Sequence, residues 1–586
     1  MKLLRDKTLT LTGERRHTPH SAALILWLFS FAVCSCAAKP SNAVYSSNTG
    51  TPVYSSTGTP VYKLTIRLVP DGPHLEVSGT IQLPPVDAAR SSIELSLSEL
   101  MNDFNVDVVS PAVSLGAVKL DQTHRPESRS GWGVINWRIT PAQPFPANEP
   151  VVLRFSYARE TGGSSFVFSL GKEVSFGAGI NTAWYPQLDD PAAGSQGLRG
   201  TGLLDFSVPS GYTVYATGAT RSEQKETAQG VFRFEVNSPA FFSFAAARYS
   251  LKKKDGPIQT ALYTLRPHDS AKQFLDGTAR ILKILVDEFG DYPFSEFAVI
   301  EVPAAQADRA GFEGASMEGC IFVNSDYIEK GFNTAFFGHE IGHQWWGNLI
   351  ASKSVEGRWI LAESMAQFGS MRAVEILEGE AAAAQYRRTG YPGYISDQCA
   401  RGYFQVVNQG QDHPLLNLSA NNNATRVIAD SKGAIVWDML ARTLGRDVFS
   451  RSLRNLIKEY KYQRISWDQF VKAVEAGSGQ DIKWFVSQWI EQTGAPDYRL
   501  TWKQEGQMLR GTVSQSAPYF RAGLEIEIQG AGNKIVKVVQ ISKEQVSFEW
   551  TVPFRAETVT LDPHYRVLRW TPEFRAETGQ SKTTDR

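Results

Sequence analysis

Hydrophobic and polar residues alternate over long stretches of the first part of the chain. Residues 62–68 place Tyr, Leu, Ile and Leu at every second position with polar residues between them, which is the period of a half-buried strand. The alternation recurs at residues 93–97, 151–155, 204–208 and 232–236, between clusters of Gly, Pro and Asp. This pattern predicts one large N-terminal β domain over residues 62–252.

The hydrophobic period changes beyond residue 253. The apolar residues between Phe274 and Val286 fall on one face of a helix, and helical spacing predicts a mainly helical domain over residues 253–496. Alternation returns at residues 524–528 and 536–541, so we expect a small β-sandwich at residues 497–574 and a polar tail at 575–586. The expected fold class is therefore multidomain α+β.

The first 61 residues carry signals of targeting rather than of a folded domain. A charged start precedes an apolar run at residues 22–33, followed by small residues and two cysteines, which is typical of an export signal over residues 1–38. Residues 33–36 loosely resemble a bacterial lipoprotein box with Cys36 as the lipidated residue; a cleaved secretory signal and an uncleaved anchor are the alternatives. Residues 39–61 repeat Val-Tyr-Ser-Ser and predict a low-complexity spacer. We expect an exported protein, periplasmic, membrane-tethered or secreted, that meets a membrane only through this N-terminal lipid or anchor.

Composition narrows the class of protein. Of the 586 residues, 42% are hydrophobic and 20% charged, which excludes global disorder. Sixty basic and sixty acidic side chains cancel, so no nucleic-acid partner is expected. Two of the four cysteines lie in the N-terminal signal, which excludes a disulfide scaffold.

The segment His339-Glu340-Ile341-Gly342-His343 predicts a metal site. A helix from an N-cap at Asn333 to a stop near residues 347–348 would place both histidines on one face, one turn apart. Two neutral imidazoles in that arrangement can bind one zinc ion, and Glu340 lies beside them to take a proton from water.

A catalytic zinc site needs a third protein ligand. The acidic candidates downstream are Glu356, Glu363 and Glu375. Glu356 falls in a predicted loop, whereas Glu363 lies in a predicted helical stretch between apolar residues. A second helix that crosses the first could direct this carboxylate at the metal, so we favour Glu363.

Residues 339–368 resemble the gluzincin aminopeptidases of peptidase family M1, the group that contains aminopeptidase N. Those enzymes carry two histidines on one helix and a glutamate on the next; here 19 residues separate His343 from Glu363, one more than is usual. Residues 289–294, 184–186 and 559–563 are similar to further landmarks of the family. The resemblance implies a saddle-like N-terminal β domain, a thermolysin-like mainly helical catalytic domain and a C-terminal β-sandwich, without the large C-terminal helical domain common in the family.

The segment Gly314-Ala315-Ser316-Met317-Glu318-Gly319 resembles the family's Gly-x-Met-Glu-Asn loop. The resemblance implies that Gly314, Met317 and Glu318 bind substrate and that Glu318 holds its free α-ammonium group. An anchored carboxylate at a fixed distance from a metal would measure off one residue, as aminopeptidase action requires. Glu313 is the other candidate for this role.

The resemblance also places Asp430 where the family carries a tyrosine that donates its hydroxyl to the oxyanion. An ionised carboxylate donates nothing and would repel that charge, so we expect a slow enzyme unless the carboxyl is protonated or another donor replaces it. The tyrosines near this position in the sequence are Tyr391, Tyr394 and Tyr403.

Together these observations predict an exported zinc aminopeptidase with one zinc ion per chain, acting on peptides with a free N-terminus. Zinc would be bound by His339, His343 and Glu363, with Glu340 as the general base. The alternatives are a zinc endopeptidase with the same ligands, and a zinc-retaining peptide-binding protein with weak catalysis.

Overall fold

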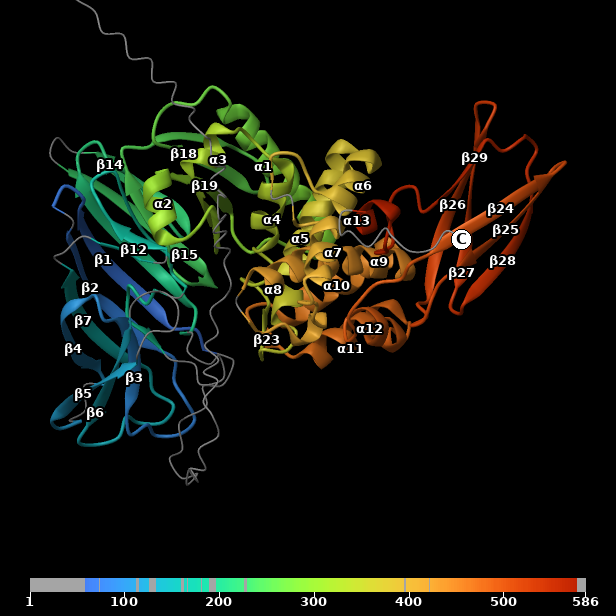
Figure 1. The fold of residues 1–586 in the computed structure, drawn as a ribbon. Helices are drawn as coiled ribbons and strands as arrows, with labels where there is room; N and C mark the ends of the chain where they lie inside the picture. The colour runs from blue at the N-terminus through green and yellow to red at the C-terminus, as the bar shows by residue number, and fades with distance from the viewer. Residues whose placement is uncertain are drawn as a thin grey trace, which may run out of the picture.

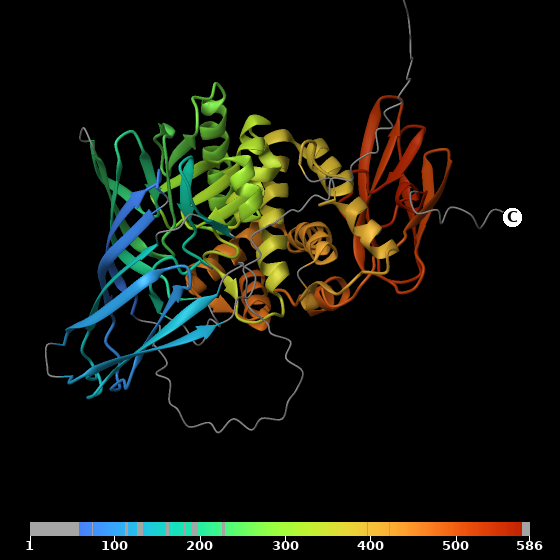
Figure 2. The ribbon, with the colours of Figure 1, turned by 60° about the vertical axis from the view of Figure 1, so that its left-hand side comes forward.

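The computed structural model describes residues 58–576, apart from 73, 112–114, 126–132, 160–162, 166, 181, 189–196, 226–228, 395–396 and 421. The predicted export signal, most of the spacer and most of the polar tail lie outside the described residues. Three regions follow one another along an elongated molecule: β sheets at one end, helices in the middle and β sheets at the other end (Figures 1 and 2). The predicted α+β fold class is confirmed.

The described residues of the N-terminal region form three sheets. A seven-stranded sheet has the order β14 (Ala219–Lys225), β15 (Gln229–Ala240), β12 (Gly200–Pro209), β1 (Val61–Val69), β2 (His74–Leu83), β7 (Val151–Arg159) and β4 (Asn102–Ser110). A four-stranded sheet has the order β11 (Gln187–Leu188), β3 (Ile93–Ser98), β6 (Val134–Pro141) and β5 (Val118–Arg125). A five-stranded sheet has the order β13 (Thr213–Ala216), β16 (Phe244–Ala247), β10 (Val174–Gly177), β9 (Phe168–Leu170) and β8 (Gly163–Ser165). In β1 every second residue is buried, as the alternation predicts.

A five-stranded sheet begins the central region. Its order is β17 (Ser250–Lys254), β18 (Gln259–Thr264), β19 (Glu296–Val302), β21 (Cys320–Asn324) and β20 (Gly314–Met317). The expected boundary between residues 252 and 253 falls inside β17, which forms a hairpin with β18. Strand β20 lies at the edge of the sheet, antiparallel to β21, and carries the first residues of the predicted substrate loop.

Helices make up most of the rest of this region. They are α1 (Ala271–Phe289), α2 (Ala304–Ala310), α3 (Ser325–Glu329), α4 (Thr334–Gly342), α5 (Arg358–Glu378), α6 (Glu380–Thr389), α7 (Ala400–Asn408), α8 (Asn423–Ile428), α9 (Ala434–Leu444), α10 (Arg446–Tyr460), α11 (Trp467–Ser478) and α12 (Lys483–Trp489). A 3₁₀ turn, η2 (Leu415–Asn417), a π-helical turn, η3 (Ala429–Gly433), and the strand pair β22 (Ala351–Ser352) and β23 (Arg464–Ile465) connect them. Within the described part of the chain, no helix combines the length and apolarity needed to cross a membrane.

The C-terminal region consists of two three-stranded sheets and a short helix. One sheet has the order β24 (Arg499–Glu505), β25 (Met508–Ser514) and β28 (Gln545–Thr551), and the other β27 (Asn533–Ile541), β26 (Ala522–Gly530) and β29 (Thr558–Leu561). Helix α13 (Pro572–Ala576) follows. The ring of Trp489 on α12 packs on Phe520, 4.9 Å between centroids, and one continuous apolar core joins these sheets to the central helices.

Candidate metal centre

Helix α4 begins after Asn333, as its sequence predicts, but ends before the predicted stop. The side chain of Asn333 accepts a hydrogen bond from the Phe336 amide at 2.9 Å, which confirms the N-cap. The predicted stop near residue 347 is wrong, because α4 ends at Gly342. His343 keeps helical dihedrals and donates its amide to the His339 carbonyl, so the one-turn spacing of the two imidazoles survives. Beyond it the chain turns back, and the Trp346 carbonyl accepts a hydrogen bond from the His343 ring.

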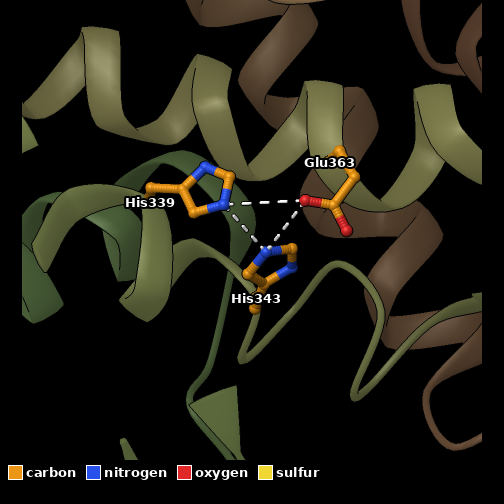
Figure 3. Close-up of side chains that lie close together, drawn as sticks. All are labelled: His339, His343 and Glu363. Carbon is orange, nitrogen blue, oxygen red and sulfur yellow. Dashed lines mark hydrogen bonds and ion pairs between the residues drawn. The ribbon is translucent and has the colours of Figure 1, made fainter. Parts of the chain in front are cut away.

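Three ligand atoms from α4 and α5 converge at one point (Figure 3). The Nε2 atoms of His339 and His343 lie 3.1 Å apart. The Glu363 Oε2 atom lies 3.6 Å from the first and 3.5 Å from the second. A tetrahedral zinc site with ligands at 2.0–2.2 Å has edges of about 3.3–3.6 Å. Two of the three distances lie within this range and the third is slightly shorter, so the three atoms are close to the spacing of one face of such a site.

The three atoms are electron-pair donors of the kind that bind a cation. The ring of His343 donates its Nδ1–H to the Trp346 carbonyl at 3.0 Å, which leaves a lone pair on Nε2 when the ring is neutral. Glu363 Oε2 is buried and has no hydrogen-bond partner. When both rings are neutral with their hydrogens on Nδ1, two imidazole lone pairs and a carboxylate oxygen face one another, and buried acceptors in such an arrangement fit a metal ion.

The two imidazoles have opposite pKa shifts while no metal shields them. Burial, together with His343 nearby, holds the pKa of His339 well below its usual value. Burial would also lower the pKa of His343, but the Glu363 carboxylate outweighs it and raises that pKa to about 9. A metal ligand must be deprotonated, so metal binding at neutral pH should release the proton from His343.

Close packing of glycines brings the two ligand helices together. A Cβ atom added at Gly338 would lie 2.9 Å from the Ser370 Cα, and one added at Gly342 would lie 2.9 Å from the Ala366 Cα. Both contacts are to the backbone of α5. Only glycine at these α4 positions allows the helices to approach closely enough for Glu363 to meet the histidines.

Glu340 lies beside the three ligands and against the edge strand. Its side chain is 1% exposed, and Gly314 of β20 is so near that an added Cβ would lie 2.6 Å from Glu340 Oε1. Burial and the neighbouring Glu363 raise the pKa of Glu340 to about 8 against the opposing effect of His343. A carboxylate with a pKa near the working pH suits proton transfer.

The other two acids considered for the third ligand lie elsewhere. Glu356 is exposed in the loop before α5. Glu375 accepts hydrogen bonds from three arginines, Arg372, Arg442 and Arg446. Among the described residues, the group that could hold a metal consists of His339, His343 and Glu363.

The predicted substrate loop is tied to the end of α4 through Gln344. Its amide donates to Ser316 Oγ at 2.8 Å and to the Met317 carbonyl at 2.7 Å, and its Oε1 accepts from the Gly319 amide at 3.0 Å. These bonds attach the edge strand β20 and the loop after it to Gln344, the residue that follows His343. The loop and the ligand helix therefore hold one another in place.

Glu318 is buried and already has partners. Its Oε1 pairs with Arg199 Nε at 2.5 Å, and its Oε2 accepts from the Phe241 amide. Burial raises the pKa of Glu318, while Arg199 opposes that shift. Sequence reasoning missed Arg199, and its place 119 residues before Glu318 gives no local signal. The alternative anchor, Glu313, accepts a hydrogen bond from the Tyr327 hydroxyl at 2.5 Å.

Asp430 lies in η3 with its carboxyl 1% exposed. Its Oδ2 accepts from Gln398 at 3.1 Å, and its Oδ1 is buried without a hydrogen-bond partner. Burial and the nearby Glu363 hold the pKa of Asp430 well above its usual range. This shift meets the condition under which an aspartic acid can donate a hydrogen bond.

The three tyrosines considered as substitutes differ in their surroundings. Tyr391 donates to Glu378 at 2.7 Å and Tyr403 to Asp412 at 2.8 Å, so both hydroxyls are engaged elsewhere. Tyr394 packs edge-on against Phe336 of α4, 6.0 Å between ring centroids. Of the three, Tyr394 is the one whose ring packs against the helix of the metal ligands.

Known proteins resemble this chain in the region that carries the site. Residues 274–489 match the model of the peptidase family M1 domain. This match includes His339, His343 and Glu363. Aminopeptidase N of Lactococcus lactis is 24% identical over 359 residues, which cover 58% of this chain and 40% of that protein. Aminopeptidase M1 of Arabidopsis thaliana is 30% identical over 168 residues, 27% of this chain and 17% of that protein. The matched part thus spans at most two fifths of the length of these two relatives.

Solved structures show the same fold. A point mutant of the M1 zinc metallopeptidase from Deinococcus radiodurans aligns with a TM-score of 0.54 at 15% identity, covering 75% of this chain and 96% of that one. A second structure of that protein, described as bound to a Tyr-Ser-Ala substrate, aligns with a TM-score of 0.55 at 15% identity and covers 95% of that chain. The M1 fold therefore extends beyond the domain matched by sequence.

Proposed function

We propose that this protein is a zinc-dependent aminopeptidase that removes N-terminal residues from peptides. The observation that carries the proposal is the convergence of His339, His343 and Glu363, whose three acceptor atoms lie close to the spacing of a tetrahedral zinc site. The M1 relatives, named as aminopeptidases, support the reaction class.

The residues around the ligands have separate roles in this proposal. Zinc bound here would supply Lewis-acid activation of water and of the scissile carbonyl. Glu340 accepts the proton of the attacking water, because its carboxylate lies beside the ligands but is not one of them. Its raised pKa lets it hold that proton until the leaving amine takes it.

The free amine of the peptide is proposed to bind at Glu318. Arg199 neutralises this carboxylate in the absence of substrate, but each carboxylate oxygen can accept a further hydrogen bond. Gly314 and Met317 belong to the same strand edge, which would lie along the substrate backbone. Capture of an ammonium group at this point would restrict cleavage to the first peptide bond.

Metal content tests the proposed ligands. His343→Ala and Glu363→Ala should each lose most of the zinc that the wild type retains after dialysis, at about one ion per chain. Glu356→Ala is the matched control, since it removes an exposed acid seven residues before Glu363 and should leave zinc content unchanged. Full zinc in the Glu363→Ala protein would point to a different third ligand.

Substrate choice tests the reaction. Zinc-loaded protein should cleave free aminoacyl substrates and ignore acetylated ones, and Glu340→Gln should keep zinc but lose most turnover. Efficient cleavage of acetylated peptides would instead favour the endopeptidase alternative. Peptide binding without turnover in the wild type would favour the binding-protein alternative.

We further propose that the protein is exported. The charged start, short apolar run and Cys36 of the N-terminal sequence support this. Mass spectrometry of the exported protein should find a chain that begins at lipidated Cys36 or soon after residue 38. An intact Met1 would favour an uncleaved anchor.

A further inference from the structure

A line of buried hydrogen bonds leads from His339 away from the three ligand atoms. Gln367 Oε1 lies 2.7 Å from His339 Nδ1, and Gln367 Nε2 lies 2.6 Å from the Tyr386 hydroxyl. That hydroxyl lies 3.0 Å from Ser370 Oγ, which lies 2.7 Å from the Ala335 carbonyl oxygen. The four side chains are fully buried. The line starts and ends on α4 and passes through α5 and α6.

The far end of this line determines the direction of every bond in it. A carbonyl oxygen only accepts, so the Ser370 hydroxyl must donate to Ala335. The Tyr386 hydroxyl must then donate to Ser370 Oγ, because the single hydroxyl hydrogen of Ser370 is already used.

The same logic reaches the imidazole. With its hydrogen directed at Ser370, the Tyr386 oxygen can only accept from Gln367, so the amide NH₂ of Gln367 faces Tyr386. The amide oxygen of Gln367 therefore faces His339 and accepts from Nδ1. The proton of the neutral ring sits on Nδ1, and the Nε2 lone pair faces Glu363 and His343.

We infer that Gln367, held by Tyr386 and Ser370, is a positioning residue that fixes the tautomer and ring orientation of His339 for metal binding. It lies one turn beyond Glu363 on α5, so one helix supplies both a metal ligand and the support for another. An amide is suited to this position because it accepts the Nδ1 hydrogen without placing another negative charge beside Glu363. The inference rests on the proposed zinc site.

Zinc affinity, measured by competition with a chelator, tests the role of Gln367. Gln367→Met keeps the size of the side chain and removes the acceptor, and should weaken zinc binding 10–100-fold, as loss of such partners typically does. Gln367→Glu restores an acceptor and should bind zinc more tightly than Gln367→Met. Gln306→Met is the matched control, because that buried glutamine bonds to Ser169 and Val174 instead, and should leave zinc affinity unchanged.

A second pair of variants tests the next bond of the line. Tyr386→Phe removes the acceptor that orients the Gln367 amide and should weaken zinc binding several-fold. Tyr403→Phe removes an equally buried hydroxyl that bonds to Asp412, and should not. If Gln367→Met fails to fold, this pair decides the matter on its own.

The proton itself can be observed after cobalt substitution. A ligand imidazole with a proton on Nδ1 then gives a shifted, exchangeable proton resonance. The wild type should show one each for His339 and His343, and Gln367→Met should lose or broaden one through faster exchange.

Three outcomes separate this inference from the proposed function. Equal zinc affinities for Gln367→Met and Gln306→Met would overturn the inference alone. A wild type that binds zinc but cleaves no peptide would contradict the proposed activity and leave the inference intact. A wild type that binds no zinc would overturn both.

Discussion

The close approach of α4 and α5 predicts a specific effect of one added methyl group. In Gly342→Ala the new Cβ would lie 2.9 Å from both the Cα and the carbonyl oxygen of Ala366. Carbon atoms prefer separations of about 3.5–4.0 Å, so the helices must separate by roughly 0.5–1 Å. Such overpacking costs about 1–3 kcal/mol, while alanine gains about 1 kcal/mol over glycine in a helix. The net loss of stability should be modest, about 0–2 kcal/mol.

We expect Gly342→Ala to reduce zinc affinity far more than it reduces the stability of the fold. The separation moves Glu363 relative to His339 and His343, and such sites tolerate displacements of only about 0.5 Å. We expect at least a tenfold loss of zinc affinity by chelator competition, together with a small drop in the melting temperature of the metal-free protein. Gly369→Ala on α5 is the matched control. Its added Cβ would meet the side chains of Phe289 and Leu285 at 3.1 and 3.2 Å, which can yield. A Gly342→Ala protein with wild-type zinc affinity would refute the reasoning.

Substitutions at three further positions probe buried carboxyl groups. Burial alone would raise the pKa of Asp438, but Arg387 and two other arginines hold it well below its usual range. Asp438→Asn should therefore cost about 3–5 kcal/mol near pH 7. The ionised Asp438 stabilises the fold fully above about pH 4, the pKa of an aspartate in the unfolded chain, and this stabilisation is lost as pH falls toward the lower pKa of Asp438 in the folded protein. The melting temperatures of the variant and the wild type should therefore converge as pH falls below about 4. Asp430→Leu should lower kcat about 10²–10³-fold, as loss of an oxyanion donor does, whereas Asp430→Asn should retain most activity; equal losses would exclude donation. Glu318→Gln should raise KM for free-amine substrates at least tenfold and change kcat less, because an ammonium group left without a charged partner binds poorly; an unchanged KM would show that Arg199 alone uses this carboxylate.

The features that sequence alone could predict depend on the spacing of residues that lie close together in the chain. Alternation in β1 marks a strand because side chains point to opposite faces at successive positions. Two histidines four residues apart mark a metal-binding face because one helical turn brings them together. Glu363 could be favoured over Glu356 since a buried acid within a helix needs a partner, and the structure gives it two imidazoles.

Features that depend on distant segments could not be predicted. Arg199 neutralises Glu318 from the N-terminal region, and no pattern within either segment indicates the pair. The role of Gln367 depends on Tyr386, which a separate helix brings to it. The early end of α4 is accompanied by a hydrogen bond between the Trp346 carbonyl and the ring of His343, which only the folded turn creates.

The charges buried in the site favour a cation there over a purely structural role for these residues. Glu340, Glu363 and Asp430 are each 1% exposed, and each has one oxygen without a hydrogen-bond partner. A buried carboxyl group with an unpartnered oxygen costs stability whether it is ionised or protonated, so a core selected for stability alone would not gather three of them. In the metal-free protein His343, whose pKa is raised, can offset one carboxylate, but burial and its neighbour keep His339 neutral, so that ring offsets none. A divalent ion would offset the negative charge and take up both nitrogen lone pairs. The residues that destabilise the metal-free fold are therefore the ones that would give the metal its affinity.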